Sequence, residues 1–484
     1  MKSNIKKNYV YNLAYQILTL ITPFITTPYV SRVLCAEGIG IYSYITAITS
    51  YFILFGCMGI ATYGQREISY LCASKEGRSN TFWEIQSLEV ILLFACLCIY
   101  SIFIAFIQNN KTLFIIAGLQ IASYIFDITW FYYGIEDFKS PVIRNFFIKL
   151  LSIILIFILV KSQQDLSKYM LVMYGSSLLG NISLWIILPR YIKKPKLSLL
   201  RPFNHFKDAF LLFLPTIAVQ IYVNFDKIML IALTKNAEAN GFYEQAQRVE
   251  SMGLLIVSSL GTVMIPRIGN YYSQKNWGAI RDSLYKSFSF MWITSIPIAI
   301  GIFCTASTFV PWFFGDGYDE VGGILKIVAW IIIIIGISNV TGSQFLIPTK
   351  QQNLFTKSVV VGMFVNIVLN MVLIPMFHAK GAAIATLIAE ITVSGLQLYY
   401  VKNFFSLRKI CTLSYKYWIA GILMGICVCV EKQFFSISTF SMFVLIASAA
   451  ILYAGILLIL RDEFMIQILS EAMSRLKTLF GGKK

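Results

Sequence analysis

Charged residues are scarce in this sequence. Of its 484 residues only 13% are charged, whereas 57% are hydrophobic and 15% are aromatic. Soluble domains carry about 25% charged residues, so a chain of this size lacks the polar surface that a water-soluble globule needs. The scarcity excludes a cytosolic enzyme, a secreted disulfide scaffold and a disordered chain. We conclude that the protein is an integral membrane protein.

The residues and motifs that usually carry chemistry are also few. There are two histidines, His205 and His378, and neither has a partner nearby in sequence with metal-ligand or nucleophile spacing. The nine cysteines include no CxxC pair and lie mostly in apolar blocks. The sequence has no Walker loop, dinucleotide fingerprint or GxSxG motif. We therefore predict no catalytic residues, no metal site, no nucleic-acid partner and no enzyme activity.

Apolar stretches of roughly 17–25 residues, which can cross a hydrocarbon core of ~30 Å, account for most of the chain. We predict an all-α polytopic membrane protein with about fourteen transmembrane helices. The predicted spans are 11–33, 41–63, 86–108, 112–133, 142–161, 168–189, 208–233, 246–266, 287–313, 322–347, 356–377, 381–401, 413–430 and 437–460.

Acidic residues are fewer than basic ones, 23 against 40, giving a formal charge of +17. In a membrane protein the first explanation is topological, because cytoplasmic loops retain Lys and Arg. With the N-terminus inside, the predicted spans leave 29 of the 40 on the cytoplasmic side, nine outside and two within helices. This asymmetry predicts that both termini are cytoplasmic.

The two halves of the chain resemble each other. Ala36–Tyr42, after the first predicted span, matches Ala237–Tyr243, after the seventh, at an offset of 201 residues. Six helices per unit is an even number, so both units insert in the same orientation, which is a transporter architecture. We predict two six-helix lobes in parallel repeat, residues 1–200 and 201–402, facing a central cavity. A helix pair (403–461) and an amphipathic cytoplasmic tail (462–484) follow.

Charged residues inside predicted spans are the candidate functional residues, because a centred charge costs about 2.5–3.5 kcal/mol on insertion scales. Asp127 and Lys149 lie at similar depth on consecutive helices and can form an ion pair, structural or functional. Asp226 and Lys227 point about 100° apart on one helix, so at least one of them faces another partner or the cavity, and Glu390 is a candidate partner for Lys227. Four other charged residues lie nearer span ends, where the penalty is smaller, namely Arg32, Arg248 (which opens its span), Glu89 and Glu250.

Several stretches resemble Wzx-type polysaccharide repeat-unit flippases of the multidrug/oligosaccharidyl-lipid/polysaccharide exporter superfamily. The most specific are Pro28–Leu34 with Gly38–Tyr42, and Asp127–Lys139 continuing to Arg144 and Asn145. Asn224–Leu230, Met264–Arg267 and Gly381–Thr386 are also similar to the family pattern.

The resemblance implies a flippase in a bacterial inner or plasma membrane. It would move a polyprenyl-diphosphate-linked oligosaccharide from the cytoplasmic to the outer leaflet by alternating access, for O-antigen or capsule synthesis. Cavity cations would bind the diphosphate, and we assign Arg32, Lys227 and Arg248 to this role. Asp127, Lys149, Asp226 and Glu390 are candidates for gating or coupling.

The sequence leaves other functions open. A lipid II flippase or a multidrug exporter of the same superfamily would share the fold, and a membrane glycosyltransferase or polymerase is a less favoured alternative. No bound cofactor is expected, although H+ or Na+ could be coupled. Expected partners are the lipid-linked substrate, membrane lipids and polysaccharide polymerase or assembly proteins.

Overall fold

The computed structural model describes residues 5–71, 74–194, 200–434 and 438–480. It divides into two compact units, residues 1–241 and 242–484. Helices dominate both, and the described residues contain no strand. The first unit is built from α1 (Ile5–Cys57), α2 (Ile60–Tyr70), α3 (Lys75–Phe106), α4 (Lys111–Ile125), α5 (Thr129–Gly134), α6 (Lys139–Leu159), α7 (Leu166–Ile187) and α8 (Phe206–Thr234), with the short turns Gln163–Asp165, Leu188–Arg190 and Pro202–His205 between them.

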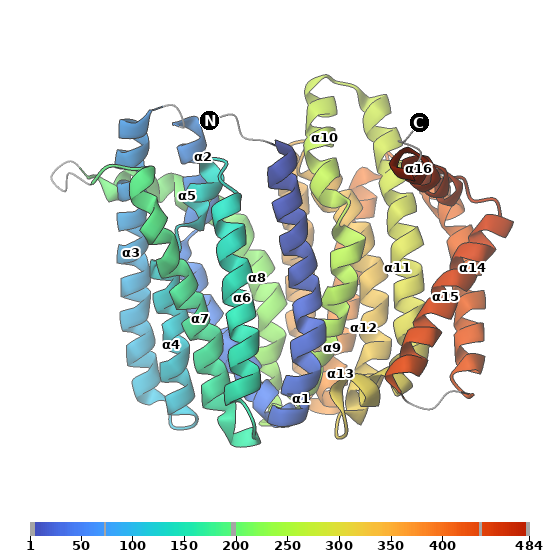
Figure 1. Ribbon diagram of the computed structural model, residues 1–484, viewed down its shortest axis with the longest axis horizontal. Helices are drawn as coiled ribbons and strands as arrows, with labels where there is room; N and C mark the ends of the chain where they lie inside the picture. Colours follow the sequence, from blue (N-terminus) through green and yellow to red (C-terminus); the bar gives the residue numbers. More distant parts are fainter. Residues whose placement is uncertain (1–4, 72–73, 195–199, 435–437, 481–484) are drawn as a thin grey trace. The chain divides into compact units, whose positions relative to one another are not determined.

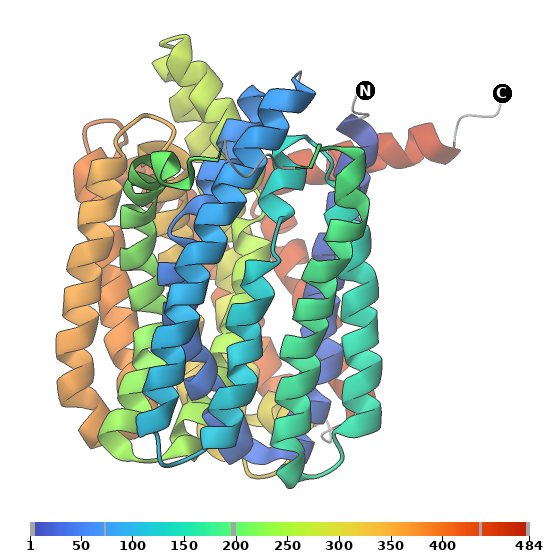
Figure 2. The same ribbon diagram turned by 90° about the vertical axis from the view of Figure 1, so that its left-hand side faces the viewer.

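The second unit starts within α9 (Ala237–Ser258). Its other helices are α10 (Gly261–Ser273), α11 (Trp277–Phe314), α12 (Asp319–Ser338), the π-helical η5 (Asn339–Leu346), α13 (Gln352–Val401), α14 (Leu407–Glu431), α15 (Thr439–Ile459) and α16 (Glu463–Phe480). Figures 1 and 2 show that, within each unit, most of the long helices run side by side. The predicted lobe boundary at residue 200 was placed from the sequence repeat, and it stays a prediction.

Two helices are too long to be single spans. α1 has 53 residues and α13 has 50, so either would exceed ~70 Å at 1.5 Å per residue. Each is interrupted by one residue with non-helical backbone angles, Cys35 in α1 and His378 in α13. The chain reverses at each, so the first predicted pair of spans falls on α1 and α2, and the pair 356–377 and 381–401 falls on α13.

The polytopic all-α prediction is confirmed. Ten of the described helices are long and apolar enough to cross a membrane, or eleven if the bent pair α9 and α10 forms one span. The total of fourteen crossings and the cytoplasmic position of both termini stay predictions. Helix boundaries differ from the predicted ones where polar residues extend a helix beyond its apolar part, as at the start of α3 and α11.

Each unit has an aromatic and aliphatic core. In the first unit Phe82 stacks against Trp130 with ring centroids 5.5 Å apart, and Phe131 is completely buried beside them. In the second unit a cluster of buried side chains joins α11, α12, α14 and α15. The predicted C-terminal pair is therefore packed on α11 rather than loosely appended.

The predicted amphipathic tail is helical. α16 covers Glu463–Phe480, and Figure 1 shows it lying across the end of the second unit, at a steep angle to α14 and α15. Asp462 accepts hydrogen bonds from the backbone N–H of Met465 (2.9 Å) and from the Tyr417 hydroxyl (3.2 Å). These contacts fix the start of the tail helix to α14. Its position at the membrane interface stays a prediction.

Candidate functional site

The predicted helix 112–133 is broken within the membrane-spanning part of the first unit. α4 ends at Ile125 and α5 begins at Thr129, so the predicted span matches the candidate span Lys111–Gly134 but is interrupted near its end. Backbone carbonyls left without helical partners are costly in a membrane, and side chains from two other helices satisfy them here. Gln86 donates to the Ile125 carbonyl (3.0 Å), and Trp185 donates to the Phe126 carbonyl (2.9 Å).

Asp127 lies in this break. Its carboxylate accepts hydrogen bonds from the backbone N–H of Thr129 (2.9 Å) and from the Thr129 hydroxyl. A carboxylate that accepts from the first N–H groups of a helix satisfies donors that have no helical partner. Asp127 therefore stabilises the start of α5, and its predicted ion pair with Lys149 stays a prediction.

Arg144 of α6 connects the break to α7. Its Nη1 donates to Asn181 Oδ1 (2.6 Å) and its Nη2 donates to Thr129 Oγ1 (3.2 Å). Asn181 in turn donates to the Ser123 carbonyl (2.9 Å), in the last turn of α4. Arg144 lies in the stretch that resembles the flippase family, and that resemblance implied no role for it. The structure shows that its guanidinium fork holds both sides of the break.

A second carboxylate lies beside this break. Glu89 of α3 is 2% exposed, and its Oε2 accepts a hydrogen bond from Trp130 Nε1 at 3.3 Å. Its charge would interact with that of Asp127. We call Glu89, Asp127, Trp130, Arg144 and Asn181 the break cluster. The sequence signal for Glu89 was its charge, but hydropathy could not show which face of α3 packs inward.

The C-terminal end of the Asp127–Lys139 stretch is held by residues outside the predicted spans. Asp137 accepts hydrogen bonds from the Ser140 hydroxyl (2.6 Å) and the Tyr191 hydroxyl (2.9 Å). Burial, and then the hydrogen bond to Asp137, raise the pKa of Tyr191, so its phenol remains a donor at neutral pH. The Asp127–Lys139 motif is therefore fixed at both ends by carboxylates.

The predicted cavity cations lie in different units. Arg32 and Lys227 belong to the first unit, on α1 and α8, and Arg248 belongs to the second, on α9. Arg248 Nε donates to Glu244 Oε1 at 3.1 Å, one turn away on the same helix. α9 starts at Ala237, so the prediction that Arg248 opens its helix was wrong. The segment before Arg248 was predicted to be a loop, but it is helical. Asn236 Oδ1 accepts a hydrogen bond from the Ala239 N–H and thereby caps the first turn of α9.

The remaining predicted site residues are mostly buried. Asp226 on α8 is 1% exposed, and its charge would interact with the hydroxyl of Tyr51 on α1, which donates to the Ile221 carbonyl (3.3 Å). Glu390 on α13 is 7% exposed and lies in the second unit. A pair between Lys227 and Glu390 stays a prediction, as does any gating role of the four candidates. Asn12 and Gln16, polar residues of the first predicted span, lie outside the described side chains.

Asn366 and Asn370 lie one turn apart on α13 and share one helix face. Asn370 donates to Asn366 Oδ1 at 3.0 Å, and Asn366 donates to Thr386 Oγ1 at 3.4 Å. Both asparagines are at most 1% exposed. These contacts join the two arms of α13, which is the interhelical hydrogen bonding expected of polar residues in packed membrane helices.

The two copies of the repeated motif meet within the first unit. A Cβ added to Gly40 would lie 1.7 Å from the Ala237 carbonyl oxygen, and one added to Gly241 would lie 1.9 Å from the Ala36 carbonyl oxygen. At the 201-residue offset Gly40 corresponds to Gly241 and Ala36 corresponds to Ala237, so the two contacts are equivalent to each other. Asn240, which is completely buried, also donates to the Gly40 carbonyl at 2.8 Å. We call this reciprocal packing the glycine contact. It has the mutual form of an isologous two-fold contact.

His205 has partners that the sequence did not reveal. Its Nδ1 lies 2.7 Å from the Tyr63 hydroxyl and its Nε2 lies 3.0 Å from Glu84 Oε2. Glu84 also accepts from the backbone N–H of Arg201 at 3.0 Å. The segment that leads into α8 is therefore bonded to α2 and α3. No cluster of three or more metal-ligating side chains occurs in the described ranges.

Comparisons with known proteins agree with this architecture. The family model "Polysaccharide biosynthesis protein" matches residues 5–272, and the "MatE" model matches residues 212–372. The chain is 24% identical to the "Putative O-antigen transporter" of Escherichia coli K12, over 83% of this chain and 98% of that protein. It is 25% identical to the "Probable low-salt glycan biosynthesis flippase Agl15" of Haloferax volcanii, over 38% of this chain and 40% of the relative.

Among solved structures, an inward closed conformation of the lipid II flippase MurJ has the same fold. The TM-score is 0.75 at 17% sequence identity, covering 94% of this chain and 99% of that one. The first family model covers more than half of the sequence, and the relatives are named as transporters and flippases rather than enzymes. This multi-pass membrane protein therefore belongs to the polysaccharide biosynthesis protein family, a Wzx-type branch of the multidrug/oligosaccharidyl-lipid/polysaccharide exporter superfamily.

Proposed function

We propose that the protein is a flippase for lipid-linked oligosaccharides. Its substrate would be an oligosaccharide repeat unit on a polyprenyl diphosphate, carried from the cytoplasmic to the outer leaflet for O-antigen or capsule synthesis. The observation that carries the proposal is the family match over residues 5–272, together with a full-length relative named as an O-antigen transporter.

Features of the first unit support transport. Substrate and coupling-ion sites of secondary transporters are typically built at discontinuous membrane helices, and the break between α4 and α5 is such a discontinuity. Internal repeats are the second common feature, and the glycine contact joins the two copies of the repeated motif reciprocally. We propose that the halves alternate in access around this repeat.

Positive side chains would bind the diphosphate. We assign this role to Lys227, half-buried on α8, and to Arg32, which lies three residues before the reversal at Cys35. Arg248 is the third candidate, because the family resemblance assigned it to the same role. Diphosphate moving outward across an inside-negative membrane would go downhill by about 2.3 kcal/mol per elementary charge per 100 mV.

We further propose that a proton, rather than Na+, is the coupled ion, and that Glu89 carries it. An ionised carboxylate in an apolar interior is costly. The indole N–H of Trp130 is its hydrogen-bond partner here, and the charge of Asp127 acts on it. Protonation would remove one of two neighbouring negative charges, so uptake and release would change the stability of the break cluster.

The test uses purified protein in liposomes with a fluorescent short-sugar polyprenyl diphosphate. A membrane-impermeant quencher reports which leaflet holds the lipid. We expect protein-dependent translocation by the wild type and its loss in Lys227→Ala. Lys111→Ala, an exposed lysine at the start of α4, is the matched control and is expected to translocate normally.

Alternative substrates form the other arms of the same assay. Translocation of lipid II in preference to the oligosaccharide lipid would assign the protein to peptidoglycan synthesis, and export of cationic dyes alone would make it a drug exporter. Polymerised or cleaved sugars would show an enzyme. A folded wild type that moves none of several lipid-linked sugars would refute the flippase.

A further inference from the structure

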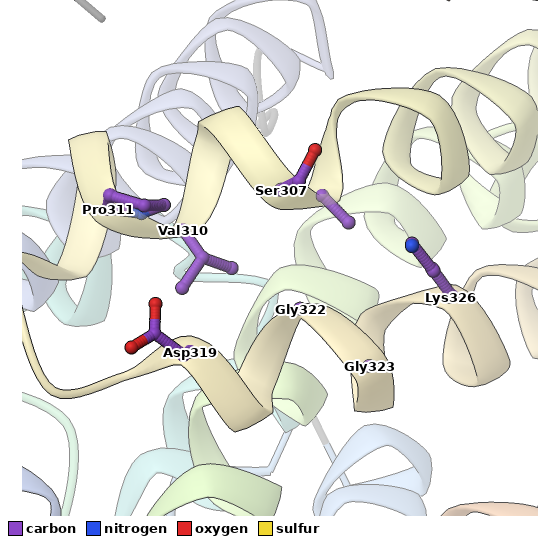
Figure 3. A pocket seen from close by; sticks show the side chains of 8 residues that line it. Ser307, Val310, Pro311, Asp319, Gly322, Gly323 and Lys326 are labelled. Carbon is purple, nitrogen blue, oxygen red and sulfur yellow. The ribbon is translucent and has the colours of Figure 1, made fainter.

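A cavity lies between α11 and α12 in the second unit, beside the turn that joins them. Its volume is about 190 Å³. Figure 3 shows Asp319 at one end and Lys326 at the other, with Ser307 of α11 on the opposite wall. The other lining residues are small or apolar: Ala306, Val310, Pro311, Gly322 and Gly323.

Two opposite charges are held apart in this cavity. Asp319 and Lys326 are seven residues apart on α12, so they share a helix face with a rise of about 10 Å between their backbones. In the described part of the chain neither side chain makes a hydrogen bond or an ion pair. Both are exposed, as is Ser307. The cavity therefore offers an acceptor at one end and donors at the other.

A second cation lies behind the floor of the cavity. A Cβ added to Gly323 would lie 2.8 Å from Cε and 3.4 Å from Nζ of Lys380. The Lys380 side chain thus lies over the bare backbone of α12 at a residue that lines the cavity. The Lys326 end is therefore the end that favours an anion, and the Asp319 end favours a cation.

The chemistry of the lining narrows the ligand to a zwitterion with a primary amine. An anionic phosphate matches Lys326 and the Ser307 hydroxyl, because charge-assisted hydrogen bonds to ammonium groups are strong. A primary ammonium can donate to the Asp319 carboxylate. A quaternary ammonium is usually bound by an aromatic cage, and the cavity lining contains no aromatic residue.

We propose that this cavity binds the phosphoethanolamine headgroup of a membrane phospholipid. The sequence predicts that the turn between α11 and α12 is at the outer surface of the membrane, where lipid headgroups are the most concentrated zwitterions. The phosphate binds at Lys326 and Ser307, with the charge of Lys380 close behind the cavity floor, and the amine binds at Asp319. The acyl chains remain in the bilayer beside α11 and α12. This site is independent of the proposed transport activity.

The experiment is native mass spectrometry of the delipidated full-length protein, titrated with phosphatidylethanolamine, phosphatidylcholine or phosphatidylglycerol. We expect phosphatidylethanolamine to bind about tenfold more tightly than either other lipid. Lys326→Gln and Asp319→Asn should each weaken it about tenfold, since each removes a charge-assisted hydrogen bond. Size-exclusion profiles and melting midpoints confirm that the variants are folded.

Asp165 and Lys168 provide the matched control. They form an ion pair of 2.7 Å in the first unit, so Asp165→Asn and Lys168→Gln remove equivalent charges away from the cavity. Both should bind phosphatidylethanolamine like the wild type.

Three outcomes would overturn the proposal. Equal binding of phosphatidylethanolamine by the wild type and both cavity variants would exclude this cavity as the site. If phosphatidylglycerol bound more tightly than phosphatidylethanolamine, and Asp319→Asn strengthened that binding further, the site would be a cationic patch without a specific amine contact. Displacement of the lipid by millimolar inorganic phosphate would show that the site takes free phosphate rather than a lipid headgroup.

Discussion

Replacing Gly40 by alanine tests the glycine contact directly. The new methyl group would lie 1.7 Å from the Ala237 carbonyl oxygen, where Cβ contacts shorter than 3.0 Å are essentially never seen. The two segments would have to separate by at least about 1.3 Å. That movement would lengthen the 2.8 Å hydrogen bond from Asn240 to the Gly40 carbonyl to roughly 4 Å and break it.

The expected cost follows from these two losses. Overpacking costs about 1–3 kcal/mol, and a lost buried hydrogen bond adds about 1 kcal/mol. The better helix propensity of alanine returns about 0.5–1 kcal/mol. Gly40→Ala should therefore destabilise the protein by about 1–3 kcal/mol, measured as a lower melting midpoint of the purified protein in detergent.

Gly175→Ala is the matched control, because a Cβ at this helical glycine has nothing within 4 Å. It should be neutral or slightly stabilising. Gly241→Ala should cost about as much as Gly40→Ala, since its Cβ would lie 1.9 Å from the Ala36 carbonyl oxygen. The double variant should cost less than the sum, because either methyl group already separates the segments. If Gly40→Ala melted like Gly175→Ala, or if the costs were additive, the reciprocal contact would be refuted.

Two further predictions concern backbone strain and coupling. His378 is exposed and has φ 51° and ψ −128°, a conformation that favours glycine. His378→Gly should therefore raise the melting midpoint by relieving about 1 kcal/mol of backbone strain. An equal rise in His378→Ala would contradict this reason, because alanine does not relieve the strain. Glu89→Gln should abolish the dependence of translocation on a pH gradient while the protein still folds, because glutamine keeps the acceptor for Trp130 but cannot release a proton. The control is Glu76→Gln, since Glu76 is an exposed glutamate in the first turn of the same helix. This variant should still translocate in a way that depends on the pH gradient. If Glu89→Gln also kept that dependence, Glu89 would be excluded as the proton carrier.

Local patterns predicted the helices well but not their interruptions. Hydropathy located the apolar segments because the membrane requires about 20 apolar residues per span. It missed the break at Phe126–Ile128, since the charge of Asp127 marked an unusual position but did not show that the helix stops there. The break exists because Gln86, Asn181 and Trp185 come from other helices to satisfy its carbonyls.

The candidate site was predicted only in part for a similar reason. The rarity of charge inside spans drew attention to Asp127 and Asp226, because a charge within an apolar run is visible in the sequence, and their functional roles stay predictions. Glu89 was undervalued because burial depends on which face of α3 packs inward. His205 was judged to lack partners because Tyr63 and Glu84 are more than 100 residues away in sequence.

The sequence by itself determined that this protein is an all-helical membrane protein with an internal repeat and a flippase-like family pattern. These properties depend on composition, local apolar length and the order of residues along the chain. Only the tertiary structure decided that Gly40 and Gly241 pack against each other's repeat, that Arg144 joins both sides of a broken helix, and that Asp319 and Lys326 share a cavity. Such features depend on how helices pack against one another, and their distances are set by that packing rather than by local pattern.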